Sequence, residues 1–138
     1  MRNQYGKTHL SLAIQQACIK AYFPQFSYSR SNKCWTGTFK PRENSPTYVV
    51  RVIYEPNNIP KVKVLKPELR SDAPHVYKNG LLCLYYPNDA SWNRSKLLGK
   101  TIFPWIAEYL YFYELWLASG EWLGSEVQHG DLSGADAM

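Results

Sequence analysis

The sequence predicts a single domain of the α+β class, with an N-terminal helix, an antiparallel β-meander, a long loop and a C-terminal helix. Three short β-branched and aromatic runs follow one another across short turns, as in a meander, and a segment of helical pattern lies on each side of them. The length of 138 residues fits one domain. Hydrophobic residues make up 45% and charged residues 20%, so a packed core is expected.

The first helix is expected to run from a cap at Thr8 to about Tyr22, where Pro24 stops it. Its apolar residues recur at the spacing of one helical face. They are Leu10, Ile14, Ala17, Cys18 and Ala21. Cys18 lies on that face, so we interpret it as a core residue.

Three strands are expected over residues 35–39, 47–54 and 61–65, because large or β-branched side chains alternate there or run continuously. Residues 25–33, rich in Ser and Tyr, are expected to form a polar loop. Cys34 opens the first strand and is interpreted as structural.

Regular periodicity disappears between Lys66 and Asp89, in a stretch that contains three prolines and a glycine. Long ordered loops in compact domains are usually functional. Cys83 lies inside this stretch, which makes the loop the candidate active-site segment.

The second helix is expected from Thr101, its cap, to Gly120, with Pro104 in the first turn. Its aromatic and aliphatic residues leave little polar face, so most of it should be buried, with the remaining aromatic face as a candidate interface. Residues 130–138 are small and polar and are expected to form a flexible tail.

The net charge of +5 is unevenly distributed along the chain. Residues 1–71 hold 12 Lys and Arg against 3 Asp and Glu (+9), whereas residues 72–138 hold 4 against 8 (−4). This division argues against a surface that coats nucleic acid, and basic and aromatic residues lie too far apart in the chain for single-strand binding. We also find no signal peptide and no apolar run long enough for a membrane span, so a cytoplasmic protein without membrane contact is expected.

The three cysteines, Cys18, Cys34 and Cys83, form no disulfide framework, because their number is odd and their spacing wide. No Cys-x-x-Cys pair occurs and the three histidines are scattered, so we expect no metal site. No cofactor is expected either. One of the thiols is left as a candidate for chemistry.

Four motifs occur in a fixed order. Trp35-Thr36-Gly37 comes first, followed by Tyr54-Glu55-Pro56 through Val64, then by Ala73 through Leu84, and finally by Trp92, nine residues after Cys83. This set resembles the ubiquitin-conjugating enzyme (UBC) family over roughly residues 8–120. The resemblance implies a UBC-like fold, with residues 1–129 as one catalytic domain.

The signature departs from the family in one tripeptide. Where the family has His-Pro-Asn, this sequence has Ala73-Pro74-His75, so the first and third residues differ. With the aromatic second helix and the tail Gly120 to Gly124, this pattern is similar to bacterial members found in CBASS antiphage operons. The resemblance implies a protein partner, a cGAS-like nucleotidyltransferase (CD-NTase), as acyl donor. We expect no adenylating domain in the chain, since 138 residues leave no room for one, and whether a separate activating enzyme is a further partner stays open.

The chemistry that the resemblance implies is thioester exchange at Cys83, which would accept an acyl group from a C-terminus and pass it to an amine. Leucines at positions 81, 82 and 84 should raise the pKa of this thiol. For His75 three roles stay open: N–H donor to an oxyanion or loop support, base for the amine, or structure alone.

Four further residues are weaker candidates near the site. Asn88 and Asp89 could orient an amine or belong to a solvated loop. Tyr77 could form part of a rim, and Trp92 matches the family's tryptophan beyond the cysteine.

Two other functions stay open for the same fold. One is a cysteine hydrolase using Cys83 and His75, although no third, orienting group lies at a recognisable spacing. The other is a non-catalytic protein-binding module, against which the cysteine at the signature position argues.

Overall fold

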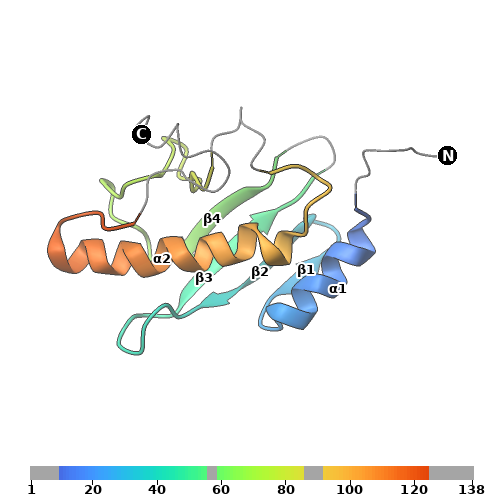
Figure 1. The fold of residues 1–138 in the computed structure, drawn as a ribbon, viewed down its shortest axis with the longest axis horizontal. Coiled ribbons are helices and arrows are strands. Elements are labelled where there is room, and N and C mark those ends of the chain that lie inside the picture. The colour runs from blue at the N-terminus through green and yellow to red at the C-terminus, as the bar shows by residue number, and fades with distance from the viewer. Residues whose placement is uncertain (1–9, 56–58, 86–91, 125–138) are drawn as a thin grey trace.

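The computed structural model describes residues 10–55, 59–85 and 92–124, and in this part of the chain two α-helices and a short 3₁₀-helix accompany one four-stranded sheet (Figure 1). The fold is of the α+β class, as predicted. In chain order the elements are α1 (Leu12–Tyr22), β1 (Ser27–Ser29), β2 (Cys34–Phe39), β3 (Tyr48–Ile53), β4 (Lys61–Lys66), η1 (Leu98–Lys100) and α2 (Ile102–Ser119).

The sheet is an antiparallel meander in the order β1-β2-β3-β4. Alternate side chains along the three longer strands are buried, because successive residues of a strand point to opposite faces. In this register Val52 pairs with Trp35 on one side and with Val62 on the other, and all three are buried. One face of the sheet therefore supplies the core.

Helix α2 lies across the sheet (Figure 1) and completes the core with its aromatic side chains. The ring of Phe103 lies 4.9 Å from that of Phe26 and 6.3 Å from that of Trp35, centroid to centroid. Farther along the helix, Tyr113 meets Tyr48 at 6.2 Å. These edge-on contacts fix the helix along its length on the strands.

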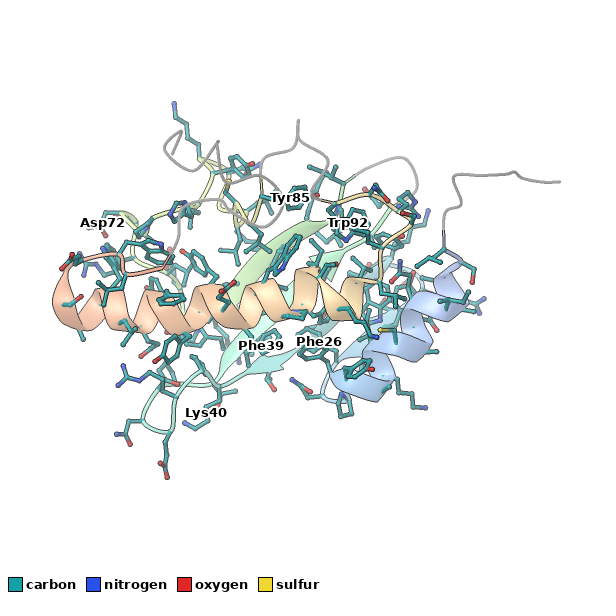
Figure 2. The ribbon with its side chains drawn as sticks, in the orientation of Figure 1. Phe26, Phe39, Lys40, Asp72, Tyr85 and Trp92 are labelled. Atoms are coloured by element: carbon teal, nitrogen blue, oxygen red, sulfur yellow. The ribbon has the colours of Figure 1, made fainter. Side chains whose placement is uncertain are left out.

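Loop residues cover a second side of α2. Figure 2 shows Tyr85 and Trp92 on the opposite side of the helix from Phe26 and Phe39. The Tyr85 ring contacts Trp105 of α2 at 5.9 Å. The helix thus packs against the sheet on one side and against loop residues on another, which accounts for the small polar fraction of its surface.

Residues 27–29 form strand β1, so the prediction of an unbroken loop over residues 25–33 is wrong. Tyr28 pairs with Trp35 of β2, and their rings lie 4.7 Å apart. Ser-Tyr-Ser has no strong strand preference of its own. This edge strand depends on its neighbour, a tertiary contact that overrides local propensity.

Helix α1 begins at Leu12, not near Thr8, because Ser11 is its N-cap. The Ser11 hydroxyl accepts a hydrogen bond from the Ile14 amide at 3.2 Å, as expected of a capping serine. The end at Tyr22 agrees with the prediction.

The predicted apolar stripe of α1 is not its buried face. Ile14 is 49% exposed, and the buried residues are Gln15 and Ile19. Gln15 is completely buried because both ends of its amide are satisfied. Its Nε2 donates to the Lys96 carbonyl at 3.0 Å, and its Oε1 accepts from the Leu98 amide at 2.9 Å. A polar residue therefore attaches α1 to η1.

Two of the cysteines have different surroundings. Cys34 is buried in β2, as a structural residue should be. Cys18 is only half-buried, so its prediction as a core residue is wrong. It lies beside Gly99, where an added Cβ would come within 2.8 Å of the Cys18 sulfur.

Helix α2 begins and ends as predicted. Gly120 closes it in the left-handed conformation, with φ 78°, and its N–H bonds to the Trp116 carbonyl at 2.7 Å. Thr101 is the N-cap residue, although its side chain makes no capping hydrogen bond. Its hydroxyl instead donates to the Leu97 carbonyl at 2.7 Å and accepts from Trp92 Nε1 at 2.8 Å.

Part of the outward face of α2 stays uncovered, since Tyr111 and Leu117 are exposed while seven other residues of the helix are buried. None of the helices in the described part of the chain combines the length and hydropathy needed to cross a bilayer. The predicted boundary at residue 129 and the predicted tail over 130–138 lie outside the described residues.

The buried amide of Gln15 leads to a prediction. Gln15→Leu should lower the free energy of unfolding by about 2 kcal/mol, because it leaves the Lys96 carbonyl and the Leu98 amide without their partner. Urea denaturation measures the loss. The control is Gln16→Leu at the adjacent, half-buried position, which should change stability by roughly 0.5 kcal/mol or less. Equal effects of the two substitutions would contradict this role of Gln15.

Candidate active site around Cys83

Cys83 follows a small hairpin that is attached to the edge of the sheet. The hairpin turns at Gly80, whose φ is 88° and whose amide bonds to the Tyr77 carbonyl at 2.8 Å. Its returning arm joins β4, where the Leu82 amide donates to the Val62 carbonyl at 2.9 Å. The long loop predicted over residues 66–89 is thus anchored to the sheet just before the cysteine.

The backbones of Cys83 and His75 are directly joined. The Cys83 amide donates to the His75 carbonyl at 2.9 Å, next to the bridge between Val76 and Leu82. The two strongest candidates from the sequence therefore lie on facing arms of one hairpin. Their separation is set by main-chain hydrogen bonds, which hold the arms in register.

The Cys83 side chain is 4% exposed. Burial raises the pKa of its thiol, and a hydrogen bond from the Tyr77 side chain lowers that pKa by less. The direction predicted from the flanking leucines is therefore confirmed: Leu82 and Leu84 are buried with the thiol. The sulfur also lies 3.9 Å from the Tyr85 carbonyl oxygen, a long thiol contact.

A hollow of about 290 Å³ lies beside the cysteine. Leu82 and Leu84, on either side of Cys83, both line it, together with Tyr77. The rest of its wall is mostly apolar and comes from the start of β4, the hairpin and the first residue of α2. These residues are Ile59, Pro60, Lys61, Val62, Asn79, Leu81, Tyr85 and Ile102. A chain segment bound there would contact both residues that flank Cys83.

His75 has an uncommon backbone conformation, with φ 60°. Its ring packs against Trp122, with centroids 5.1 Å apart. The preceding residue, Pro74, is held from the helix side, because the Tyr109 hydroxyl donates to its carbonyl at 2.7 Å. Burial raises the pKa of Tyr109 above its ordinary value, so this hydroxyl stays protonated in alkaline solution as well.

The weaker candidates are distributed differently. Tyr77 does lie at the site, hydrogen-bonded to Cys83. Trp92 is a core residue whose ring contacts Tyr54 at 6.2 Å and whose indole N–H bonds to Thr101. Asn88 and Asp89 lie outside the described residues.

Sequence reasoning assigned no contact at the site to Tyr109 or Trp122. Their contacts with residues 74–75 span 35 or more positions of the chain, so no local spacing indicates them. The nearest signal was the tail Gly120 to Gly124, noted only as part of the resemblance. Among the described residues no three His, Cys, Asp or Glu side chains gather as metal ligands would.

The raised pKa of Cys83 leads to a prediction for its reactivity. The rate of alkylation by iodoacetamide should keep rising above pH 9, where the rate for a free cysteine of pKa about 8.5 levels off, because the Cys83 thiolate forms at higher pH. Tyr77→Phe should shift this dependence of alkylation rate on pH to still higher pH, since it removes the hydrogen bond that favours the thiolate. Mass spectrometry of the Cys83 peptide follows the rate.

The control for that substitution is Tyr111→Phe, which removes the hydroxyl of an exposed tyrosine on α2. Tyr111→Phe should leave the dependence of the Cys83 alkylation rate on pH unchanged. A plateau below pH 8 in the wild-type chain would contradict the raised pKa.

Comparison with known proteins places the chain in a family. None of the curated proteins matches its sequence. A family model described as Type II CBASS E2 protein matches residues 15–130, which include most of α1, the whole of α2, the sheet and the Cys83 hairpin. Because this match covers most of the chain, the protein belongs to the Type II CBASS E2 family.

Proposed function

We propose that the protein is a ubiquitin-conjugating-like acyl carrier with Cys83 as its nucleophile. In the first step the Cys83 thiolate attacks the carbonyl of an activated C-terminus, a thioester forms and the activating group leaves. In the second step an amine attacks that thioester, an amide forms and the thiol is released. A cysteine suits both steps, because a thiolate is a strong nucleophile and also a good leaving group.

The observation that carries the proposal is the position of Cys83. It is the residue after the hairpin, its main chain is fixed to His75, and its two neighbours line a hollow. An extended C-terminal segment in that hollow would lie against the two residues that flank the nucleophile. Membership of the Type II CBASS E2 family supports the same chemistry.

The raised pKa of Cys83 favours a carrier over a cysteine hydrolase. Hydrolases of that kind keep a ready thiolate by lowering the pKa of the cysteine, typically with a histidinium beside it. Here burial acts in the opposite direction. A thiol that stays neutral at rest is suited to reacting with an activated donor.

For His75 we propose the role of N–H donor to the oxyanion that forms during transfer. It stands where the resembling family has asparagine, whose amide is also an N–H donor. Its carbonyl bond to the Cys83 amide fixes its Cα close to the nucleophile. The hydrogen bond from the Tyr77 side chain favours the thiolate form of Cys83 before the acyl group is attached.

We propose a CD-NTase as the acyl donor and another protein as the source of activation. Membership of a CBASS family supports a protein partner from that pathway. The chain's basic first part and acidic second part suit two protein partners better than they suit one anionic polymer.

The proposal predicts a labile covalent adduct on Cys83. A synthetic peptide with a C-terminal mercaptoethanesulfonate thioester should acylate the wild-type chain, and dithiothreitol should remove the added mass. Free lysine should then receive the peptide faster than from a peptide thioester of cysteine alone. Intact-mass spectrometry and product analysis follow the two steps.

Cys83→Ala should abolish the adduct, whereas Cys18→Ala, at a half-buried thiol, should leave it unchanged. An adduct that persists in Cys83→Ala would rule out the proposal. Rapid release of the free peptide acid without any amine would indicate a hydrolase. No acylation of the wild-type chain would leave the binding module as the better function. Co-expression with a tagged CD-NTase, followed by non-reducing electrophoresis, tests the donor.

The proposed role of His75 is tested by two substitutions. His75→Ala should slow transfer to lysine roughly 100-fold, the usual loss for one oxyanion donor. His75→Asn should stay within about threefold of wild type, because it restores an N–H donor. If His75 were a base, Asn would be as poor as Ala and the pH dependence of transfer would change in both variants.

A further inference from the structure

We infer that Trp122 is a positioning residue for transfer at Cys83, and that it acts by holding the imidazole of His75. This inference rests on the proposed function. It assigns a role in the reaction to the segment that follows α2, on which none of the candidate catalytic residues lies.

The chain turns back sharply after α2. Gly120 closes the helix in the left-handed conformation, and the Glu121 amide then bonds to the Ser119 hydroxyl at 3.1 Å. In Figure 1 the red segment beyond α2 runs back over the end of the helix. This turn carries Trp122 to the side of the helix that faces the Cys83 loop.

The indole of Trp122 lies between the helix and the loop. Its centroid is 5.3 Å from the ring of Tyr109 and 6.2 Å from the ring of Phe112, both on α2. On its other side it meets the His75 ring at 5.1 Å, with 59° between the planes. Contacts with α2 thus fix the indole, and the indole in turn limits where the imidazole can lie.

The main chain at His75 has other supports. The Tyr109 hydroxyl holds the Pro74 carbonyl, and the Cys83 amide holds the His75 carbonyl. Removing the indole would therefore take away a ring contact of the imidazole while leaving these main-chain bonds in place. A change of this kind impairs catalysis without unfolding the site, because a displacement of about 1 Å at a reacting group can cost roughly 100-fold in rate.

The test uses the peptide thioester probe and measures transfer from Cys83 to lysine. Trp122→Ala should slow transfer roughly tenfold, and Trp122→Phe should restore most of the rate because a ring remains against His75. Circular dichroism and urea denaturation check that both variants fold. The control is Leu123→Ala, next to Trp122 but 55% exposed, which should transfer at the wild-type rate.

A double-mutant cycle separates positioning through His75 from a general structural effect. If Trp122 acts through His75, the double variant His75→Ala/Trp122→Ala should transfer no more than about twofold slower than His75→Ala alone. The inference would be overturned if the fold-losses of the two single variants multiplied in the double variant. An unchanged transfer rate in Trp122→Ala would overturn it as well.

An independent test is the proton NMR chemical shift of the His75 ring. The adjacent indole should displace this shift from the value of a histidine without an aromatic neighbour, and Trp122→Ala should return it toward that value. An unmoved His75 resonance in Trp122→Ala would count against the contact. A wild-type chain that accepts no acyl group would refute the proposed function instead, so the two failures are distinguishable.

Discussion

The hydrogen bond from the Tyr109 hydroxyl to the Pro74 carbonyl fixes the candidate site to the core from the helix side. Tyr109 lies on α2, which is fixed to the sheet by Phe103 and Tyr113. Pro74 precedes His75, whose carbonyl binds the Cys83 amide. Cys83 is therefore located relative to the core from two sides, through these two hydrogen bonds to α2 and through the bond of the adjacent Leu82 amide to Val62 of β4. Because burial raises the pKa of Tyr109 above its ordinary value, this donor stays protonated in alkaline solution as well.

The packing of α2 against both the sheet and the loop explains several features together. Its sheet side needs aromatic bulk to fill the space above the valines of β3 and β4. Its loop side needs Tyr109 and Trp105 to hold the segments on which His75 and Tyr85 lie. Because α2 packs against both the sheet and the loop, few of its positions can hold charged residues. Its composition thus reflects the support of a site as well as a core.

Much of the fold could be predicted from the sequence, because its signals are local. The alternation of polar and apolar residues over 61–65 indicates a strand without reference to the rest of the chain. Gly120 indicates a helix end because glycine adopts the left-handed conformation readily. Cys83 could be found because its motif lies within a dozen residues. The sequence also indicated correctly that apolar neighbours raise the pKa of its thiol.

What escaped prediction depends on partners far along the chain. Gln15 is buried because its side-chain amide forms hydrogen bonds with the Lys96 carbonyl and the Leu98 amide. The apolar pattern of its neighbours in the sequence predicts instead that Gln15 is exposed. Strand β1 exists because β2 lies beside it. Trp122 reaches His75 only after the chain has reversed at Gly120. Such contacts are properties of the folded arrangement, and no local periodicity encodes them.

The left-handed backbone at His75 also restricts how this position can change during evolution. Apart from glycine, the residues that adopt a positive φ most readily are Asn, Asp and His. Of these four, only Asn and His have a side-chain N–H group. A lineage that must keep both the bend of the loop and a donor beside the nucleophile can therefore exchange one of these residues for the other and little else. The histidine of this chain and the asparagine of the family it resembles are the two members of that narrow set.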